Sequence, residues 1–354
     1  MAIDIDLVAT FQAELELCGV GPGVQVAALS EGQIRADYAQ ATLAAARLLG
    51  AEAFHLNLPA RTGGGFVGTV GKTPLSGQAA LVDMLKRVDI VIDLVGLLFS
   101  PEQNEILASG TRMLMVIEPL HVLKQLAPDR ELRRRVEFAG ERLSRAEQLR
   151  VTSAAGTDIN YRLTQYPVLT EYGYTDTPGR WDHWPSGFLL TSGDDAGVDG
   201  TVVIAPGDIS IAFNQYFSTP VRLTVEKGYV TKIDGEGVDA HLMRGYMDSF
   251  NDPRAYAVSH IGWGLNEKAS WHHLATTRTA MSPATHGAPE IGMNALSFYG
   301  NVLFSLGPNS EVGGTNDTQC HIDLPLRGCS LFLDGETIVD RGRIVPPQMR
   351  APGR

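Results

Sequence analysis

A histidine and an aspartate two residues apart form the most suggestive chemical pattern in the sequence. His321 and Asp323 lie in the segment CHIDLP. In an extended strand, side chains two residues apart point to the same face, so this imidazole and this carboxylate can converge on one cation. Non-haem iron, manganese and zinc all accept such a pair of ligands. The alternative is a surface strand that carries two polar residues.

A third ligand is available from the segment SHIGWGLN, which contains His260. Its glycines permit close backbone approach and leave room for a ligand beside the histidine. Two histidines and one carboxylate form the facial arrangement of Fe(II) oxygenases, which leaves positions open for substrate and dioxygen. The alternative is a core histidine packed beside Trp263. Spacing alone does not decide between the two interpretations.

Other histidines and acids compete for the same role. His272 and His273 are adjacent, so in regular structure they face different ways, and we interpret them as solvated or packing residues. Glu311 lies in the glycine-rich segment GPNSEVGG, which lacks the ending of a phosphate-binding loop. Glu311 can support a ligand, bind another ion or belong to a plain turn.

The stretch from Gln165 to Gly187 is dense in functional side chains, including Glu171 and His183. Loops of this density often build sites, and a carboxylate and a histidine in one pocket can divide acid and base duties. The alternative is an ordered surface loop held in place by Trp181 and Trp184.

The elements that must position these residues suggest two domains. Residues 1–155 alternate short apolar runs with helical spacing, which favours an α/β domain with a mainly parallel sheet. The predicted strands are Gln25–Leu29, Ala53–Leu58, Val88–Val95 and Arg112–Ile117, and the predicted helices are Tyr38–Leu49, Gly77–Arg87 and Asp129–Leu149.

Residues 156–354 are richer in glycine, proline and aromatic residues, and we expect an α+β domain that binds the metal and carries the catalytic site. Hairpins are predicted around Lys227-Gly228 and Asp334-Gly335. The predicted strands are Val203–Ala205, Val221–Glu226 and Tyr229–Ile233, followed by a helix at Asp239–Phe250 and a second hairpin over Leu331–Val345.

Composition narrows the class of protein. The formal charge of −11 repels polyanions, so nucleic acid and anionic membranes are not expected partners. Three cysteines without paired spacing fit a reducing cytoplasm. The N-terminus reads as an amphipathic helix, and no apolar run is long enough to span a membrane.

Motifs over nearly the whole chain resemble those of the 2,5-dihydroxypyridine 5,6-dioxygenase family. They are SHIGWGLN, QYPVLTEYGYTDTPGRWDHWPSGF, EKGYVTKIDG, FNDP, FYGNVLFSLGPNSEVGG, TQCHIDLPLR, SPEQNEIL and GTRMLMVIEP. The resemblance implies an Fe(II)-dependent, extradiol-like dioxygenase that opens 2,5-dihydroxypyridine, or a close analogue, to N-formylmaleamic acid. It also implies a homo-oligomer, a role in hydroxypyridine catabolism, and a fold similar to thermophilic metallo-aminopeptidases.

Matched motif by motif, the resemblance implies a role for particular residues. The iron ligands fall on His260, His321 and Asp323, and the catalytic pocket residues fall on Glu171 and His183. Ser305, in the LFSLGPN segment, falls at a substrate-binding position.

Two substrate-binding positions depart from the family pattern. The family has a histidine before the SPEQ segment, which reaches a neighbouring protomer's pocket, and here that position is Phe99. A second family histidine shortly before QYP corresponds to Asn160. Both changes bear on which hydroxylated pyridine is bound and leave the iron ligands unaltered.

Two rival functions come from other classes. A metallo-hydrolase needs two metal ions with bridging carboxylates, for which Glu290 and Glu311 are conceivable ligands. A binding protein without catalytic activity would keep the fold and show no dioxygen uptake with any hydroxypyridine.

Overall fold

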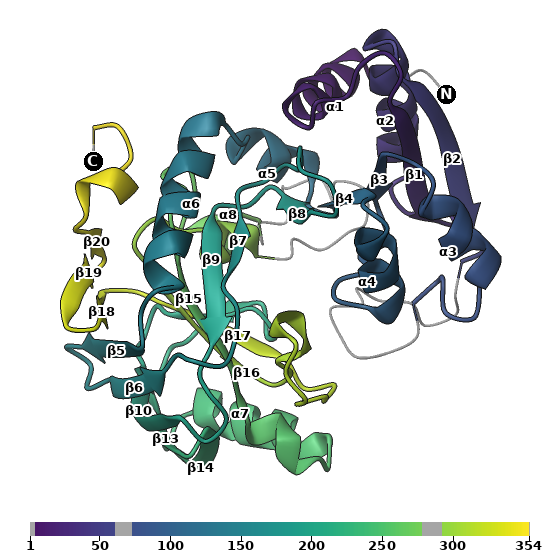
Figure 1. Ribbon diagram of the computed structural model, residues 1–354. Coiled ribbons are helices and arrows are strands. Elements are labelled where there is room, and N and C mark those ends of the chain that lie inside the picture. Colours follow the sequence, from purple (N-terminus) through teal and green to yellow (C-terminus); the bar gives the residue numbers. More distant parts are fainter. Residues whose placement is uncertain (1–3, 61–72, 278–291, 354) are drawn as a thin grey trace. The chain divides into compact units, whose positions relative to one another are not determined.

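The computed structural model describes residues 4–60, 73–277 and 292–353 (Figure 1). Within this part of the chain, no helix combines the length and the apolar character needed to cross a membrane. The three cysteines are buried, and each is a free thiol.

The described chain folds into two compact units, each assembled from separate stretches of sequence. The first unit consists of residues up to Asp129 together with Tyr172–Ser186. The second consists of Arg130–Glu171 and the described parts of Gly187–Thr279 and Gly292–Arg354. The structural units therefore differ from the continuous domains 1–155 and 156–354 that the sequence predicts.

Strand pairing explains this difference. β5 (Gln148–Ser153) pairs with β6 (Asp158–Arg162) and β18 (Cys329–Leu333), which draws residues before 155 into the second unit. β8 (Trp181–Trp184) instead pairs with β4 (Arg112–Val116), so a segment after 155 joins the first unit. The partners β18 and β4 both lie far along the chain from the boundary at 155.

The first unit is an α/β unit built on one parallel sheet of order β2-β1-β3-β4-β8. Its inner strands β3 and β4 are buried at every residue, as parallel strands covered on both faces are. The predicted parallel sheet is confirmed. Its other elements are α1 (Ile5–Leu17), β1 (Gln25–Glu31), α2 (Ala36–Leu48), β2 (Glu52–Leu58), α3 (Ala79–Leu85), β3 (Ile90–Asp93), α4 (Pro101–Ala108) and α5 (Leu120–Gln125).

One predicted helix is longer than the helix that forms. α6 (Arg130–Leu143) ends before Gln148, where the sequence predicts helix as far as Leu149. From Gln148 to Val151 the residues alternate between exposed and buried, which is the period of a strand. Pairing on both sides of β5 therefore prevails over helical propensity.

The second unit contains antiparallel sheets and a few helices. An eight-stranded sheet has the order β14-β13-β10-β6-β5-β18-β19-β20, and a five-stranded sheet has the order β17-β16-β15-β9-β7. The elements not yet given are β7 (Leu169–Glu171), β9 (Phe188–Ser192), β10 (Val198–Ile204), β11 (Ile209–Ser210), β12 (Gln215–Tyr216), β13 (Val221–Glu226), β14 (Tyr229–Asp234), α7 (Val238–Ser249), η1 (Pro253–Tyr256), β15 (Val258–Gly264), α8 (His273–Thr277), α9 (Met293–Leu296), β16 (Val302–Leu306), η2 (Ser310–Val312), β17 (Ile322–Leu326), β19 (Glu336–Asp340), β20 (Arg343–Ile344) and η3 (Pro347–Met349).

Both predicted hairpins are present in this unit. Lys227 and Gly228 have φ values of 50° and 80°, and Asp334 and Gly335 have φ values of 48° and 84°. Two successive residues in the left-handed region characterise a two-residue hairpin loop whose twist matches that of its strands. These turns fix the registers of β13 with β14 and of β18 with β19.

Candidate metal centre

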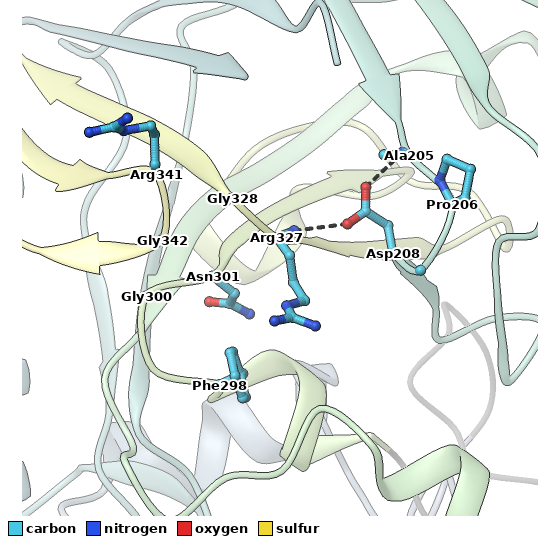
Figure 2. Close-up of a pocket in the computed structure, with 11 residues that line it drawn as sticks. Ala205, Pro206, Asp208, Phe298, Gly300, Asn301, Arg327, Gly328, Arg341 and Gly342 are labelled. Carbon is cyan, nitrogen blue, oxygen red and sulfur yellow. Dashed lines mark hydrogen bonds between the residues drawn. The ribbon is translucent and has the colours of Figure 1, made fainter. Parts of the chain in front are cut away.

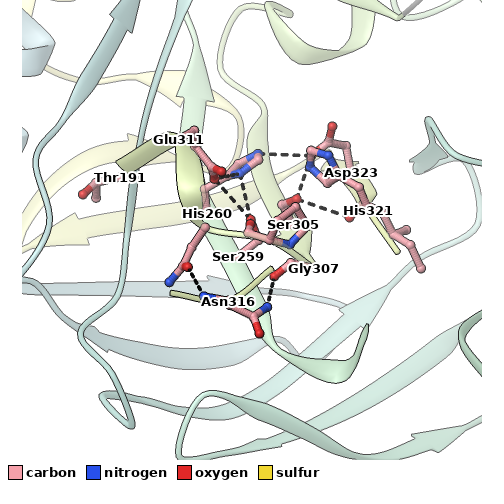
Figure 3. A network of polar contacts seen from close by, with 12 residues as sticks. Thr191, Ser259, His260, Ser305, Gly307, Glu311, Asn316, His321 and Asp323 are labelled. Atoms are coloured by element: carbon pink, nitrogen blue, oxygen red, sulfur yellow. Dashed lines mark hydrogen bonds and ion pairs between the residues drawn. The ribbon is translucent and has the colours of Figure 1, made fainter. Parts of the chain in front are cut away.

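Two strands of the five-stranded sheet, β15 and β17, bring His260, His321 and Asp323 together across β16 (Val302–Leu306). His260 lies on β15, His321 directly precedes β17, and Asp323 lies on β17. One ligand atom from each lies within 4.8 Å of the others. Nε2 of His260 is 3.1 Å from Oδ1 of Asp323, and Nε2 of His321 is 3.4 Å from that oxygen (Figure 3).

Local backbone features place these side chains at one level of the sheet. The register of β15 with β16 shifts between Val258 and Ile261, so the irregularity, a bulge, falls in the two-residue stretch that includes His260. Bulges of this kind re-aim a side chain, and they are common beside active sites. On the other side, Ser305 of β16 pairs directly with Asp323 of β17.

Glu311 holds the ring of His260 from the side opposite Asp323. Nδ1 of His260 lies 2.9 Å from Oε1 of Glu311, and the Glu311 side chain is only 4% exposed. A carboxylate that accepts the Nδ1 proton of a histidine fixes its tautomer and leaves Nε2 free to bind a metal. The sequence left Glu311 open between such a partner and a plain turn, and the structure favours the partner.

Two asparagines close the loop that carries Glu311. The backbone N–H of Asn316 donates to Oδ1 of Asn309 at 2.9 Å, and the N–H of Asn309 donates to the carbonyl of Asn316 at 3.2 Å. A Cβ on Gly314 would lie 2.1 Å from the Asn309 side chain, so this position requires glycine. The short loop is therefore rigid where it presents the carboxylate.

Ser305 lies against Asp323. Its buried hydroxyl donates to Oδ1 of Asp323 at 2.7 Å. The sequence predicts Ser305 as a substrate-binding residue, and the structure shows it orienting a candidate ligand.

The pKa values of His260 and Asp323 show how strongly the two imidazoles and the carboxylate interact. Burial alone lowers the pKa of His260, but the hydrogen bonds to Asp323 and Glu311 raise it to about 10. Burial raises the pKa of Asp323, yet the neighbouring imidazoles hold it well below its usual range. The protons that the imidazoles share with Asp323 are those that a bound cation would replace.

The donor set fits a mononuclear divalent metal. Nε2 of His321 is buried, and it lies 3.4 Å from Oδ1 of Asp323. The side chains of His321 and Asp323 are 23% and 16% exposed, against 6% for His260, so one side of the group is open to a small molecule. Two imidazoles, one carboxylate and an open side characterise non-haem iron sites.

Comparisons with known proteins agree with this chemistry. Residues 6–346 match the family described as NicX, 2,5-dihydroxypyridine 5,6-dioxygenase. A 2,5-dihydroxypyridine 5,6-dioxygenase from Pseudomonas putida KT2440 is 42% identical over 347 residues, which are 97% of each chain. This chain belongs to the 2,5-dihydroxypyridine 5,6-dioxygenase family. The resemblance that its motifs carry is confirmed, and the chain is an oxidoreductase.

Solved structures support the same assignment. The structure of a 2,5-dihydroxypyridine dioxygenase from Pseudomonas putida KT2440 superposes with a TM-score of 0.91 at 41% identity, covering 97% of this chain and 98% of that one. AmpT from Thermus thermophilus superposes with a TM-score of 0.56 at 12% identity, covering 98% of this chain and all of that one. The second likeness is one of fold alone.

In this member of the 2,5-dihydroxypyridine 5,6-dioxygenase family, Glu171 lies in the same sheet as the triad. Phe188 of β9 pairs with both Glu171 and Gly264, so Glu171 and His260 share a face of the sheet. They are two strands and four residues apart, which is roughly 16 Å between Cα atoms at ~4.8 Å per strand and ~3.3 Å per residue. Glu171 is therefore no ligand of the same ion, and its catalytic role remains a prediction.

His183 lies on β8 of the first unit. Burial, together with the positive charge of Arg35, lowers the pKa of His183 to about 3, so its ring is neutral at physiological pH. Nε2 is buried and has no hydrogen-bond partner among the described residues. Asp182 beside it accepts hydrogen bonds from Arg180 and from backbone N–H groups of the loop, including that of His183 itself.

The two positions that depart from the family pattern have different surroundings. Phe99, in the first unit, packs against Trp181 with 5.2 Å between ring centroids. Asn160 is exposed on the eight-stranded sheet, where it pairs with Arg150 and Asp199. Asn160 lines a cavity of about 660 Å³ that includes none of the triad residues.

The rival ligands do not join the triad. His272 is exposed, and Nδ1 of buried His273 lies 3.1 Å from the Ser270 carbonyl. Glu290 lies outside the described residues. Among the described residues, the three members of the triad are the one group of acids, histidines and cysteines with metal-binding geometry.

A separate cavity of about 400 Å³ lies between turns of the second unit (Figure 2). Two of its polar side chains already form hydrogen bonds within the protein. The carboxylate of Asp208 accepts from the N–H groups of Ala205 and Arg327 at 2.7 and 2.8 Å, and the amide of Asn301 donates to the Ala295 carbonyl at 2.6 Å. These hydrogen bonds stabilise the turns, and the residues that line the cavity include none of the triad.

Substituting Glu311 by glutamine tests its support of His260. The glutamine amide oxygen can accept the hydrogen bond from Nδ1 of His260 but carries no negative charge, so it makes Nε2 a weaker ligand. We therefore expect the affinity of the protein for Fe(II) to fall roughly 10–100-fold. Anaerobic competition with a chelator measures the change. Glu226→Gln makes the same change of charge at an exposed position and should leave the affinity unaltered. Equal affinities in both variants would contradict a role for Glu311 at the centre.

Proposed function

We propose that this chain is an Fe(II)-dependent dioxygenase that opens the ring of 2,5-dihydroxypyridine, or of a close analogue, to N-formylmaleamic acid. One observation carries the proposal: two histidines and one aspartate converge within 4.8 Å in a member of this dioxygenase family. Both atoms of dioxygen enter the product, so the reaction needs no further reductant. Assembly as a homo-oligomer is part of the proposal.

The bound ion would supply a Lewis acid for a ring oxygen and a path for electrons from the electron-rich ring to dioxygen. The protein's own residues prepare this chemistry. Glu311 keeps Nε2 of His260 directed at the ion, and Ser305 holds the Asp323 carboxylate in place. The bulge in β15 keeps His260 at the level of Asp323.

Proton transfer falls to His183 and Glu171 in this proposal. A neutral imidazole can accept a hydrogen bond from a ring hydroxyl, and it can take up and return the proton once the bound ion lowers the pKa of that hydroxyl. A buried carboxylate can share that work. His183 is neutral and its Nε2 is unused by described residues, while Glu171 is 5% exposed.

An oxygen-electrode screen of hydroxypyridines with anaerobically iron-loaded protein tests the function. We expect one iron per chain and one dioxygen consumed per 2,5-dihydroxypyridine. Two zinc or cobalt ions per chain with peptide cleavage would favour the hydrolase instead. Iron-loaded protein that consumes no dioxygen with any hydroxypyridine would favour a binding protein.

A further inference from the structure

Ser192 is the direct strand neighbour of His260. It ends β9, and its backbone pairs with that of His260 across the antiparallel contact between β9 and β15. Side chains of a direct antiparallel pair lie on the same face, with Cβ atoms about 4.5–5.5 Å apart. The Ser192 hydroxyl therefore stands beside the imidazole of a candidate metal ligand.

The hydroxyl of Ser192 has nothing to bind within the described protein. The residue is 1% exposed, and its Oγ makes no hydrogen bond to any described residue. Hydroxyls close by are satisfied: Ser305 donates to Asp323, and Thr191 donates to the carbonyl of Pro167 at 3.0 Å. A buried hydroxyl left without a partner is costly, so its partner is best sought in a ligand.

The backbone around Ser192 is held firmly. A Cβ on Gly193 would lie 2.4 Å from Cγ2 of Val198, so the chain packs tightly directly after the serine. Asp194 then accepts hydrogen bonds from the N–H groups of Thr164 and Gln165 at 2.6 and 2.8 Å. The serine is consequently fixed on the face that carries His260.

We propose that Ser192 is a positioning residue whose hydroxyl donates a hydrogen bond to a ring oxygen of the hydroxypyridine bound beside the triad. The inference rests on the proposed function. The hydroxyl can donate to either ring oxygen, and monohydroxylated analogues distinguish the two. A hydrogen bond from the Ser192 hydroxyl to one of the two ring oxygens would determine which of them binds the ion.

Anaerobic titration of the iron-loaded protein tests this without turnover. The ligands are 2,5-dihydroxypyridine, 2-hydroxypyridine and 3-hydroxypyridine, of which the last two each lack one ring oxygen. We expect Ser192→Ala to raise the Kd for 2,5-dihydroxypyridine about tenfold, which is the loss of one neutral hydrogen bond. The Kd should also rise about tenfold for the analogue that keeps the ring oxygen bonded by Ser192. It should stay unchanged for the analogue that lacks this oxygen.

Iron content and melting temperature separate this role from a structural one. Both should be unchanged in Ser192→Ala, because only an unpaired hydroxyl is removed. Thr191→Val deletes the neighbouring hydroxyl on the other face of β9 and should not change any of the three Kd values. If each of the three compounds has the same Kd for wild type and for Ser192→Ala, the inference about Ser192 is overturned and the proposed function is not affected. Wild-type protein that holds iron but binds none of them would overturn the proposed function as well.

Discussion

Replacing His321 by alanine is expected to remove bound iron and ring cleavage together. The substitution leaves two of the three candidate ligands, His260 and Asp323, and it deletes the buried Nε2 that lies 3.4 Å from Oδ1 of Asp323. Loss of a supporting residue behind a ligand costs up to ~100-fold in metal affinity, and loss of a ligand costs more. Iron analysis after anaerobic loading, with dioxygen uptake on the same sample, measures both effects.

A second substitution keeps this prediction independent of folding. Asp323→Asn preserves the shape of the side chain but removes its charge, and it should likewise lose iron and activity. His241→Ala, at an exposed position on α7, is the matched control and should retain both. Full iron content and full activity in His321→Ala would exclude the triad.

Replacing His183 by alanine is expected to leave the iron in place and slow the reaction by about 10²–10⁴-fold, the usual contribution of a general acid or base. Its pKa of about 3 keeps the imidazole neutral at every pH at which the enzyme would work. A neutral ring with an unused Nε2 can accept a hydrogen bond from a ring hydroxyl, and it can take the proton once a bound ion lowers the pKa of that hydroxyl. Single-turnover kinetics at saturating substrate, with iron measured in parallel, tests this role.

Two results would contradict the assignment of His183. Loss of iron in His183→Ala would make it a ligand, and an unchanged rate would remove it from catalysis. His121→Ala, at an exposed position of α5 in the same unit, controls for the loss of an imidazole. Reactivation of His183→Ala by added imidazole would support a role in proton transfer.

Much of the fold follows from local patterns. The apolar runs that become β1, β3 and β4 and the turns at Lys227-Gly228 and Asp334-Gly335 are legible in the sequence because each depends on neighbouring residues. The division into units is not, since β18 is far along the chain from its partner β5, and β4 is far from its partner β8. A boundary set by composition cannot anticipate such pairings.

The candidate centre also has some features that depend on local sequence and others that depend on contacts between distant residues. His321 and Asp323 are two residues apart, so their shared face is a local property of one strand. The support of His260 by Glu311 and the orientation of Asp323 by Ser305 join separate strands and a loop. Ser192 gives no signal in the sequence, because a serine at the end of an apolar run is common.

The sequence shows the residue types of the centre, its family motifs and the segment that bears two candidate ligands. The folded structure adds that His260 comes within reach of those two ligands. It also adds that Glu311 and Ser305 form hydrogen bonds with the ligands, and that Ser192 pairs with His260. Side chains two residues apart in an extended segment share a face, and this depends on the local sequence alone. The meeting of strands depends on register, on a bulge and on close glycine contacts among residues far apart in the chain.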